Sequence, residues 1–156
     1  MPRLDAERIA LWRQFCLLST GVQRKLDQAL ADEHRLPLAW YEVLTAVRAA
    51  GGSMRVHELC AVLDEVPSSL SRRLDRMTDD GYLRRKHTPL ADDRRAVSVQ
   101  ITAAGRYAWR DANITYRRLV QKYFAQHLTD TDLAALQRVW GKLEVELRTE
   151  PDGDDD

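Results

Sequence analysis

Cysteine is scarce in this chain of 156 residues: the only two, Cys16 and Cys60, lie far apart, and neither belongs to a CxxC pair. That inventory excludes a disulfide scaffold and a structural zinc site. The four histidines are also scattered, with no two at the spacing that places a pair of ligands on one face of a helix. We therefore expect neither a metal site nor a cofactor.

Long apolar runs are also missing, since no segment approaches the roughly 18 residues that indicate a membrane-spanning helix. Charged residues interrupt the first fifteen positions, where a signal peptide would carry its apolar stretch. The sequence thus predicts a cytoplasmic protein with no membrane partner. It contains no GxSxG motif, no glycine-rich phosphate loop and no carboxylate pair on a plausible cleft element, so we expect no catalytic residues and no enzyme.

What the chain does contain is enough apolar sequence for a packed core, with 44% hydrophobic and 31% charged residues. The formal net charge of zero hides a local imbalance. Residues 67–95 carry eight basic against five acidic side chains, whereas residues 144–156 carry one basic against seven acidic side chains. The sequence therefore has a basic patch in its middle and an acidic tail.

Hydrophobic periodicity predicts a long helix over residues 5–33, with an apolar stripe that covers about half of its circumference. Pro37 is well placed to open a second helix that runs through Val47. A short helix is predicted next, over residues 55–63. A tight turn separates it from another helix, which starts after Val66. Asp79, Asp80 and Gly81 end the latter helix, because glycine suits the left-handed cap position.

The last third of the chain begins with two predicted strands, residues 82–86 and 96–101, joined by a charged loop. Thr102 is typical of the cap of another long helix. A final helix starts after Leu128 and repeats apolar residues at the spacing of a coiled-coil seam, namely Leu133, Leu136, Trp140, Leu143 and Leu147. The acidic residues 149–156 are expected to be disordered.

This order of elements is that of a winged helix-turn-helix: a mainly α fold with a small β-hairpin, flanked by long N- and C-terminal helices. The second helix of the motif would offer donors to a DNA major groove, and the tip of the hairpin would reach an adjacent minor groove. The candidate DNA-binding residues are Ser68, Ser69, Ser71, Arg72, Arg73, Arg76, Asp93, Arg94 and Arg95. The alternative is that these arginines form a solvated face paired with neighbouring aspartates.

Together these segments resemble the multiple antibiotic resistance regulator (MarR) family of transcription factors. The resemblance extends over residues 38–106 in the family's order, and the long flanking helices fit it too. It rests on residues 38–44 (LAWYEVL), 58–63 (ELCAVL), 68–77 (SSLSRRLDRM), 81–83 (GYL), Pro89, 93–95 (DRR) and 101–106 (ITAAGR).

The resemblance implies a single domain over residues 1–148, with a DNA-binding lobe at about 38–101 and dimerisation helices at about 5–33 and 103–148. It implies a homodimeric repressor that binds double-stranded DNA at an inverted-repeat operator. Ser68 to Asp79 would form the recognition helix, and Asp93 would steady Arg95 in the minor groove. Val66 stands where the family often has a Ser or Thr cap, so we expect Pro67 to set the start of that helix.

Regulation remains open at this point. Trp12, Phe15, Trp40 and Tyr41 could line a crevice for a small aromatic effector, or they could be ordinary core aromatics at helical spacing. Cys16 lies where peroxide-sensing relatives carry a reactive cysteine, but its apolar neighbours favour an inert core thiol over a redox sensor. A further alternative is a helical protein-interaction module that no longer binds DNA.

Overall fold

The computed structural model describes residues 5–87 and 97–149. The chain divides into two compact units, Met1–Leu119 and Val120–Asp156. The predicted hairpin tip with Asp93, Arg94 and Arg95, and the acidic tail from residue 150, lie outside the described residues. No helix in the described part is long and apolar enough to cross a membrane.

The first unit follows the predicted order of elements. The helix α1 begins after Asp5, whose carboxylate accepts a hydrogen bond from the Arg8 backbone at 2.8 Å, and it ends at Arg35, which adopts a left-handed conformation. The elements in chain order are α1 (Ala6–His34), α2 (Leu38–Ala49), β1 (Ser53–Arg55), α3 (Val56–Leu63), α4 (Pro67–Asp79), β2 (Leu83–His87), β3 (Val97–Ile101) and α5 (Ala103–Tyr123), the last of which continues into the second unit.

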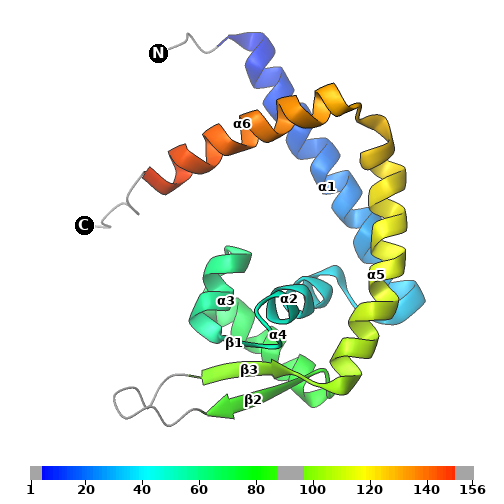
Figure 1. Ribbon diagram of the computed structural model, residues 1–156, viewed down its shortest axis with the longest axis vertical. Coiled ribbons are helices and arrows are strands. Elements are labelled where there is room, and N and C mark those ends of the chain that lie inside the picture. The colour runs from blue at the N-terminus through cyan, green and yellow to red at the C-terminus, as the bar shows by residue number, and fades with distance from the viewer. Residues whose placement is uncertain (1–4, 88–96, 150–156) are drawn as a thin grey trace. The chain divides into compact units, whose positions relative to one another are not determined.

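The sheet differs from the predicted two-stranded hairpin, because it has three antiparallel strands in the order β1-β3-β2. Figure 1 shows β2 and β3 as paired arrows below helices α2–α4. In β1, which sequence analysis missed, Met54 pairs with Val99 of β3. Gly51 and Gly52 allow this strand to form because both have a positive φ, 90° and 100°, which turns the chain from α2 into the sheet.

The core of this unit lies between the sheet and helices α2, α3 and α4. Each helix contributes leucines at helical spacing, and the sheet contributes alternate residues of its inner face. The fully buried side chains include Leu44, Leu59, Leu70, Leu74, Met77 and Val99. Burial of this apolar face fixes which side of α4 remains available to a partner.

Thr102 and Gly105 join the sheet to α5. The Thr102 hydroxyl lies 2.6 Å from the Gly81 carbonyl oxygen and 3.0 Å from that of Tyr82, and it accepts a hydrogen bond from the Gly105 backbone at 3.0 Å. The predicted cap is therefore confirmed. A Cβ atom at position 105 would overlap the Tyr82 carbonyl oxygen.

We expect Gly105→Ala to destabilise the protein by about 1–3 kcal/mol, since the Tyr82 backbone must move to admit the methyl group. Gly21→Ala in α1 is the matched control, because nothing lies within 4 Å of a Cβ atom at that position. Removing a helical glycine there should instead stabilise the protein by roughly 0.5–1 kcal/mol. Urea unfolding of both variants measures the difference, and equal midpoints would contradict the proposed overlap.

The second unit contains a short 3-10 helix, Ala125–His127, and the helix α6, Asp130–Thr149. Thr129 and Asp132 cap α6 reciprocally: the Thr129 backbone donates to the Asp132 carboxylate at 2.9 Å, and the Asp132 backbone donates to the Thr129 hydroxyl at 3.2 Å. The Thr129 hydroxyl also donates to the Asp132 carboxylate at 2.6 Å, and this hydrogen bond, followed by that from the Thr129 backbone, lowers the pKa of Asp132. In the single chain, α6 leaves Leu133, Val139, Trp140, Leu143, Val145 and Leu147 exposed.

Candidate nucleic-acid interface

The helix α4 begins as the sequence predicts. Val66 precedes it without a side-chain cap, and Pro67 occupies the first turn, where its fixed φ favours the helical conformation. Leu70, Leu74 and Met77 turn inward and are fully buried. The outward side consists of Ser68, Ser69, Arg72 and Arg76, which are all exposed.

Arg73 differs from the other two arginines of α4. Its guanidinium donates to the Glu65 carboxylate at 2.5 Å, and the two side chains are only 18% and 26% exposed. Glu65 belongs to the turn between α3 and α4, so this ion pair joins the turn to the middle of α4. Ser71 is also half-buried.

A second ion pair joins α4 to the hairpin. Arg85 of β2 donates to the Asp75 carboxylate at 2.6 Å. Beside it, Arg84 donates to the Gln100 side chain of β3 at 3.0 Å. The recognition helix predicted from the sequence is thus held by the turn on one flank and by the hairpin on the other.

The arginines of this surface therefore fall into two groups. Arg73 and Arg85 are paired with acids, Arg73 with Glu65 and Arg85 with Asp75. Of the candidate DNA-binding arginines on α4, Arg73 is thus internally paired, although with a glutamate and not with an aspartate as the alternative supposed. Arg72 and Arg76 form no hydrogen bond or ion pair with any residue in the two described ranges. Glu65 and Asp75 were missed as partners, because they lie eight and ten positions from the arginines they bind and no local spacing rule connects them.

An open groove of about 480 Å³ runs between the start of α2 and the exposed side of α4. It is lined by Pro37, Ala39 and Trp40 on one side and by Ser68, Ser69, Arg72, Arg73 and Arg76 on the other. Five of the predicted DNA-binding residues thus share one concave surface with an indole ring. The surface is basic, because Glu65 neutralises only Arg73.

Comparison with known proteins supports the family resemblance seen in the sequence. Residues 35–96 match the family model described as MarR family. The transcriptional regulator PecS of Dickeya dadantii (strain 3937) is 29% identical over 106 residues, which are 67% of this chain and 62% of PecS. The match therefore spans less than two thirds of that relative. Residues 35–96 are therefore a MarR-family domain.

Solved structures of MarR-family proteins share this fold. A MarR mutant from E. coli complexed with operator DNA is 26% identical, with a TM-score of 0.75, over 90% of this chain and 99% of that one. Sco3205 from Streptomyces coelicolor in complex with DNA is 23% identical, with a TM-score of 0.86, over 97% of each chain. The winged-helix prediction is confirmed.

The four aromatic residues suggested for an effector crevice do not form one cluster. Trp12 packs against Phe15, with ring centroids 6.1 Å apart, and both are exposed on α1. Trp40 instead contacts Tyr82 edge-to-face at 6.0 Å.

Tyr41 belongs to the core between α2 and α5. It stacks on Tyr116 at 4.6 Å and donates to the Asn113 side chain at 2.8 Å. Burial is the main cause that raises the pKa of Tyr41 to about 12. Trp109 completes the stack at 6.4 Å from Tyr41, with its indole donating to Thr45 at 2.9 Å. Trp109 and Tyr116 thus lie on the side of α5 that packs against the core.

Cys16 lies outside the core, contrary to the expectation of a core thiol. It is half-buried on α1, and the neighbouring Ile9 and Trp12 are exposed in the single chain. The core residues of α1 are Leu26 and Leu30, at its other end.

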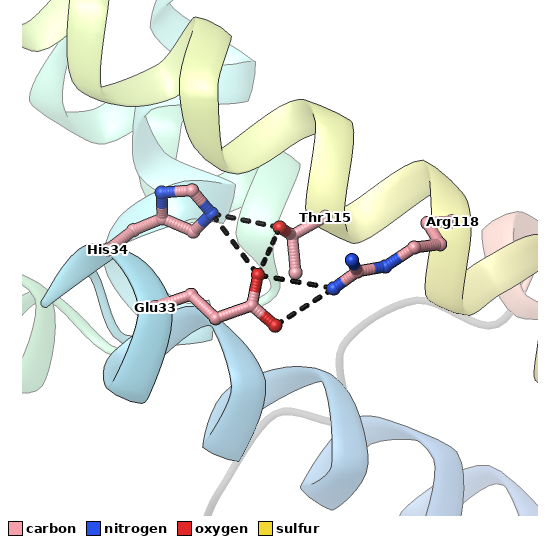
Figure 2. A network of polar contacts seen from close by, with 4 residues as sticks. All are labelled: Glu33, His34, Thr115 and Arg118. Atoms are coloured by element: carbon pink, nitrogen blue, oxygen red, sulfur yellow. Dashed lines mark hydrogen bonds and ion pairs between the residues drawn. The ribbon is translucent and has the colours of Figure 1, made fainter.

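A polar network joins the end of α1 to α5 within the first unit, as Figure 2 shows. Thr115 is 4% exposed, and its hydroxyl donates to Glu33 at 2.8 Å while lying 2.9 Å from Nε2 of His34. Arg118 donates to both oxygens of Glu33, at 2.8 and 3.1 Å. The Thr115 hydroxyl has one hydrogen and gives it to Glu33, so Nε2 of His34 must be the donor in its contact with Thr115.

The hydrogen bond from Thr115, and after it the Arg118 charge, lower the pKa of Glu33 below its usual 4.5. A lowered folded-state pKa means that ionised Glu33 stabilises the fold above about pH 4.5 and that this contribution is lost as the pH falls through the folded-state value. Between pH 5 and pH 3, we expect the melting temperature of Glu33→Gln to fall less steeply than that of the parent. Asp32→Asn is the control, because Asp32 is exposed and makes none of these contacts. Parallel curves for Glu33→Gln and the parent would show that the network contributes no stability.

Proposed function

We propose that this protein is a sequence-specific transcriptional repressor that binds double-stranded DNA as a homodimer at an inverted-repeat operator. The observation that carries the proposal is the exposed side of α4, where Arg72 and Arg76 have no partner in the described part of the chain. A protein that holds arginines unpaired on a rigid, two-sided support has donors available for phosphates and base edges. The operator complex of the related E. coli MarR mutant supports this assignment.

The proposed DNA contacts come from two places. Ser68, Ser69, Ser71, Arg72 and Arg76 would approach the major groove from α4. Asp93, Arg94 and Arg95, from the hairpin tip outside the described residues, would approach the adjacent minor groove, with Asp93 orienting Arg95. Arg73 belongs with the supporting residues, because its charge is already paired with Glu65.

The domain roles follow the same proposal. Residues 38–101 form the DNA-binding lobe, and residues 5–33 and 103–148 provide the dimer contacts. Both α1 and α6 expose apolar side chains that a second copy would cover. Because a two-fold axis relates two recognition helices, their half-sites would lie about 34–36 Å apart along the duplex.

Selection of bound sequences from random duplexes tests this function directly. The expected result is an inverted repeat whose half-sites are one helical turn apart. Absence of any enriched sequence, together with elution from a heparin column at low salt, would favour the alternative of a protein-interaction module that does not bind DNA.

We further propose release from DNA by a small aromatic effector rather than by oxidation of Cys16. The aromatic residues Trp12 and Phe15 are exposed on α1 in the single chain, so a ligand bound to them would lie beside the proposed dimer contacts. Operator release is measured with salicylate-like acids and with an organic hydroperoxide, in the parent and in Cys16→Ser. Release by the hydroperoxide that disappears in Cys16→Ser would identify a redox sensor instead.

A further inference from the structure

The groove between α2 and α4 has a composition that neither base readout nor core packing explains. Along α4, Ser69, Arg73 and Arg76 stand on the flank that faces the start of α2, while Ser71 and Asp75 stand on the flank that faces the hairpin. Between the flanks, Arg72 lies at the outermost position, opposite the buried Leu70 and Leu74. Arg76 thus lies nearer to the α2 flank than Arg72, and both arginines line the groove together with Trp40.

The charges of the groove are only partly compensated. Glu65 neutralises Arg73. Arg73 therefore lines the groove without adding to its net positive charge. The carboxylate of Asp27 in α1 caps the Leu38 backbone N–H at 2.8 Å, so the start of α2 already has its own anionic partner. The positive charge of Arg76 and the indole N–H of Trp40 are left without a hydrogen-bond partner among the described residues.

An occupant must therefore accept hydrogen bonds and carry negative charge, and it must pass along an open groove beside a major-groove helix. A strand of DNA backbone meets all three requirements, because its phosphates are accepting anions and its deoxyribose presents an apolar face to an aromatic ring. We propose that this groove seats one strand of the operator backbone, with Arg76 and the indole N–H of Trp40 both bound to phosphate. The proposal rests on the DNA-binding function above and assigns α2 a direct part in it.

Two substitutions test the assignment on the full-length protein bound to its selected operator. Arg76→Ala removes the charge, and we expect about a tenfold or greater loss of affinity on specific and random duplexes alike. The slope of log affinity against log salt concentration should fall by about 1 for each protomer. Trp40→Phe keeps an aromatic ring against Tyr82 and removes only the N–H, so it should weaken binding without changing base preference. Thermal melting identifies any loss that reflects unfolding.

Methylphosphonate substitution locates the contact. Neutralising backbone phosphates one at a time should reveal positions that weaken binding of the parent but have no further effect on Arg76→Ala or Trp40→Phe. Arg110→Ala is the control: it removes an exposed α5 arginine 3.9 Å from Asp111 and should remain as sensitive to these substitutions as the parent.

Other results overturn the proposal. If Arg76→Ala changes the preferred bases and leaves the salt slope unaltered, Arg76 reads bases. If inorganic phosphate at constant ionic strength binds the parent–operator complex without releasing the DNA, and does not bind the Arg76→Ala complex, the groove is a site for a free anion. Normal affinity of both variants would exclude the groove from DNA contact. Failure of the parent itself to bind any selected duplex would instead contradict the proposed function.

Discussion

Replacing Arg72 with alanine is expected to lower the preference for the selected operator over random duplex by about 10- to 100-fold. A bidentate contact from arginine to a base contributes about 1–3 kcal/mol of discrimination, and 1.4 kcal/mol corresponds to a factor of ten. Affinity for random duplex should fall much less, because base contacts carry the discrimination between sequences.

The structure gives a physical reason why Arg72 should have this effect. Its side chain is exposed, lies at the outermost position of α4 and has no ion-pair partner in the described part of the chain. No intramolecular pair must break before it binds DNA. Its supporting helix is fixed by the Glu65–Arg73 and Arg85–Asp75 ion pairs, so the contact does not require ordering of the backbone that carries Arg72.

The measurement is a binding titration of Arg72→Ala on the operator, on each single-base variant and on random duplex at one salt concentration. If Arg72 contacts a base, Arg72→Ala loses discrimination between bases at one position of each half-site and retains it at the other positions. Arg110→Ala again serves as the control for removal of an exposed arginine. A uniform loss on all duplexes would mean that Arg72 contacts phosphate. For Arg95, outside the described residues, alanine should weaken binding with a smaller salt slope.

The helices of this fold could be predicted because their apolar faces repeat over many residues. The buried side of α4 can be recognised from the sequence alone by the spacing of Leu70, Leu74 and Met77. Pro67 marks the start of the helix. The strand β1 could not be predicted, since three residues with one half-buried Met54 give no periodic signal. It forms only because Gly51 and Gly52 turn the chain toward β3, which is a tertiary requirement.

The candidate site could be predicted as a set of residue types but not as a set of roles. Ser68, Arg72 and Arg76 are exposed as the helical spacing indicates. The role of Arg73 depends on Glu65, and the pair meets only because α4 folds back beside its own preceding turn. The groove depends on Trp40, whose position beside α4 arises from the packing of α2 against the core. Both features are products of tertiary structure.

Replacing Leu143 with glutamate is expected to convert the dimer into a monomer at micromolar concentration and to reduce operator affinity by about a hundredfold or more. In the single chain, α6 exposes Leu133, Leu143 and Leu147 at 47%, 51% and 77%. These residues belong to the seam predicted from the sequence, and an apolar row of this length favours burial against a second copy.

The size of the effect follows from symmetry and desolvation. One substitution appears twice in a two-fold dimer, and an uncompensated buried charge costs about 3–5 kcal/mol. Loss of the dimer also separates the two recognition helices, so each half-site must be bound independently. Affinity for the full operator should therefore fall toward that of a single half-site.

Lys142→Glu is the matched control, because it introduces the same acid at the adjacent position of α6, off the predicted seam. Sedimentation equilibrium should give twice the chain mass for the parent and for Lys142→Glu, and the mass of one chain for Leu143→Glu. Helical content from circular dichroism should be similar in all three, which separates dissociation from unfolding. A parent that sediments as a compact single chain would refute the dimer. If Leu143→Glu remains a dimer, the contact between copies must lie elsewhere, with the exposed Leu11 and Leu18 of α1 as the next residues to replace.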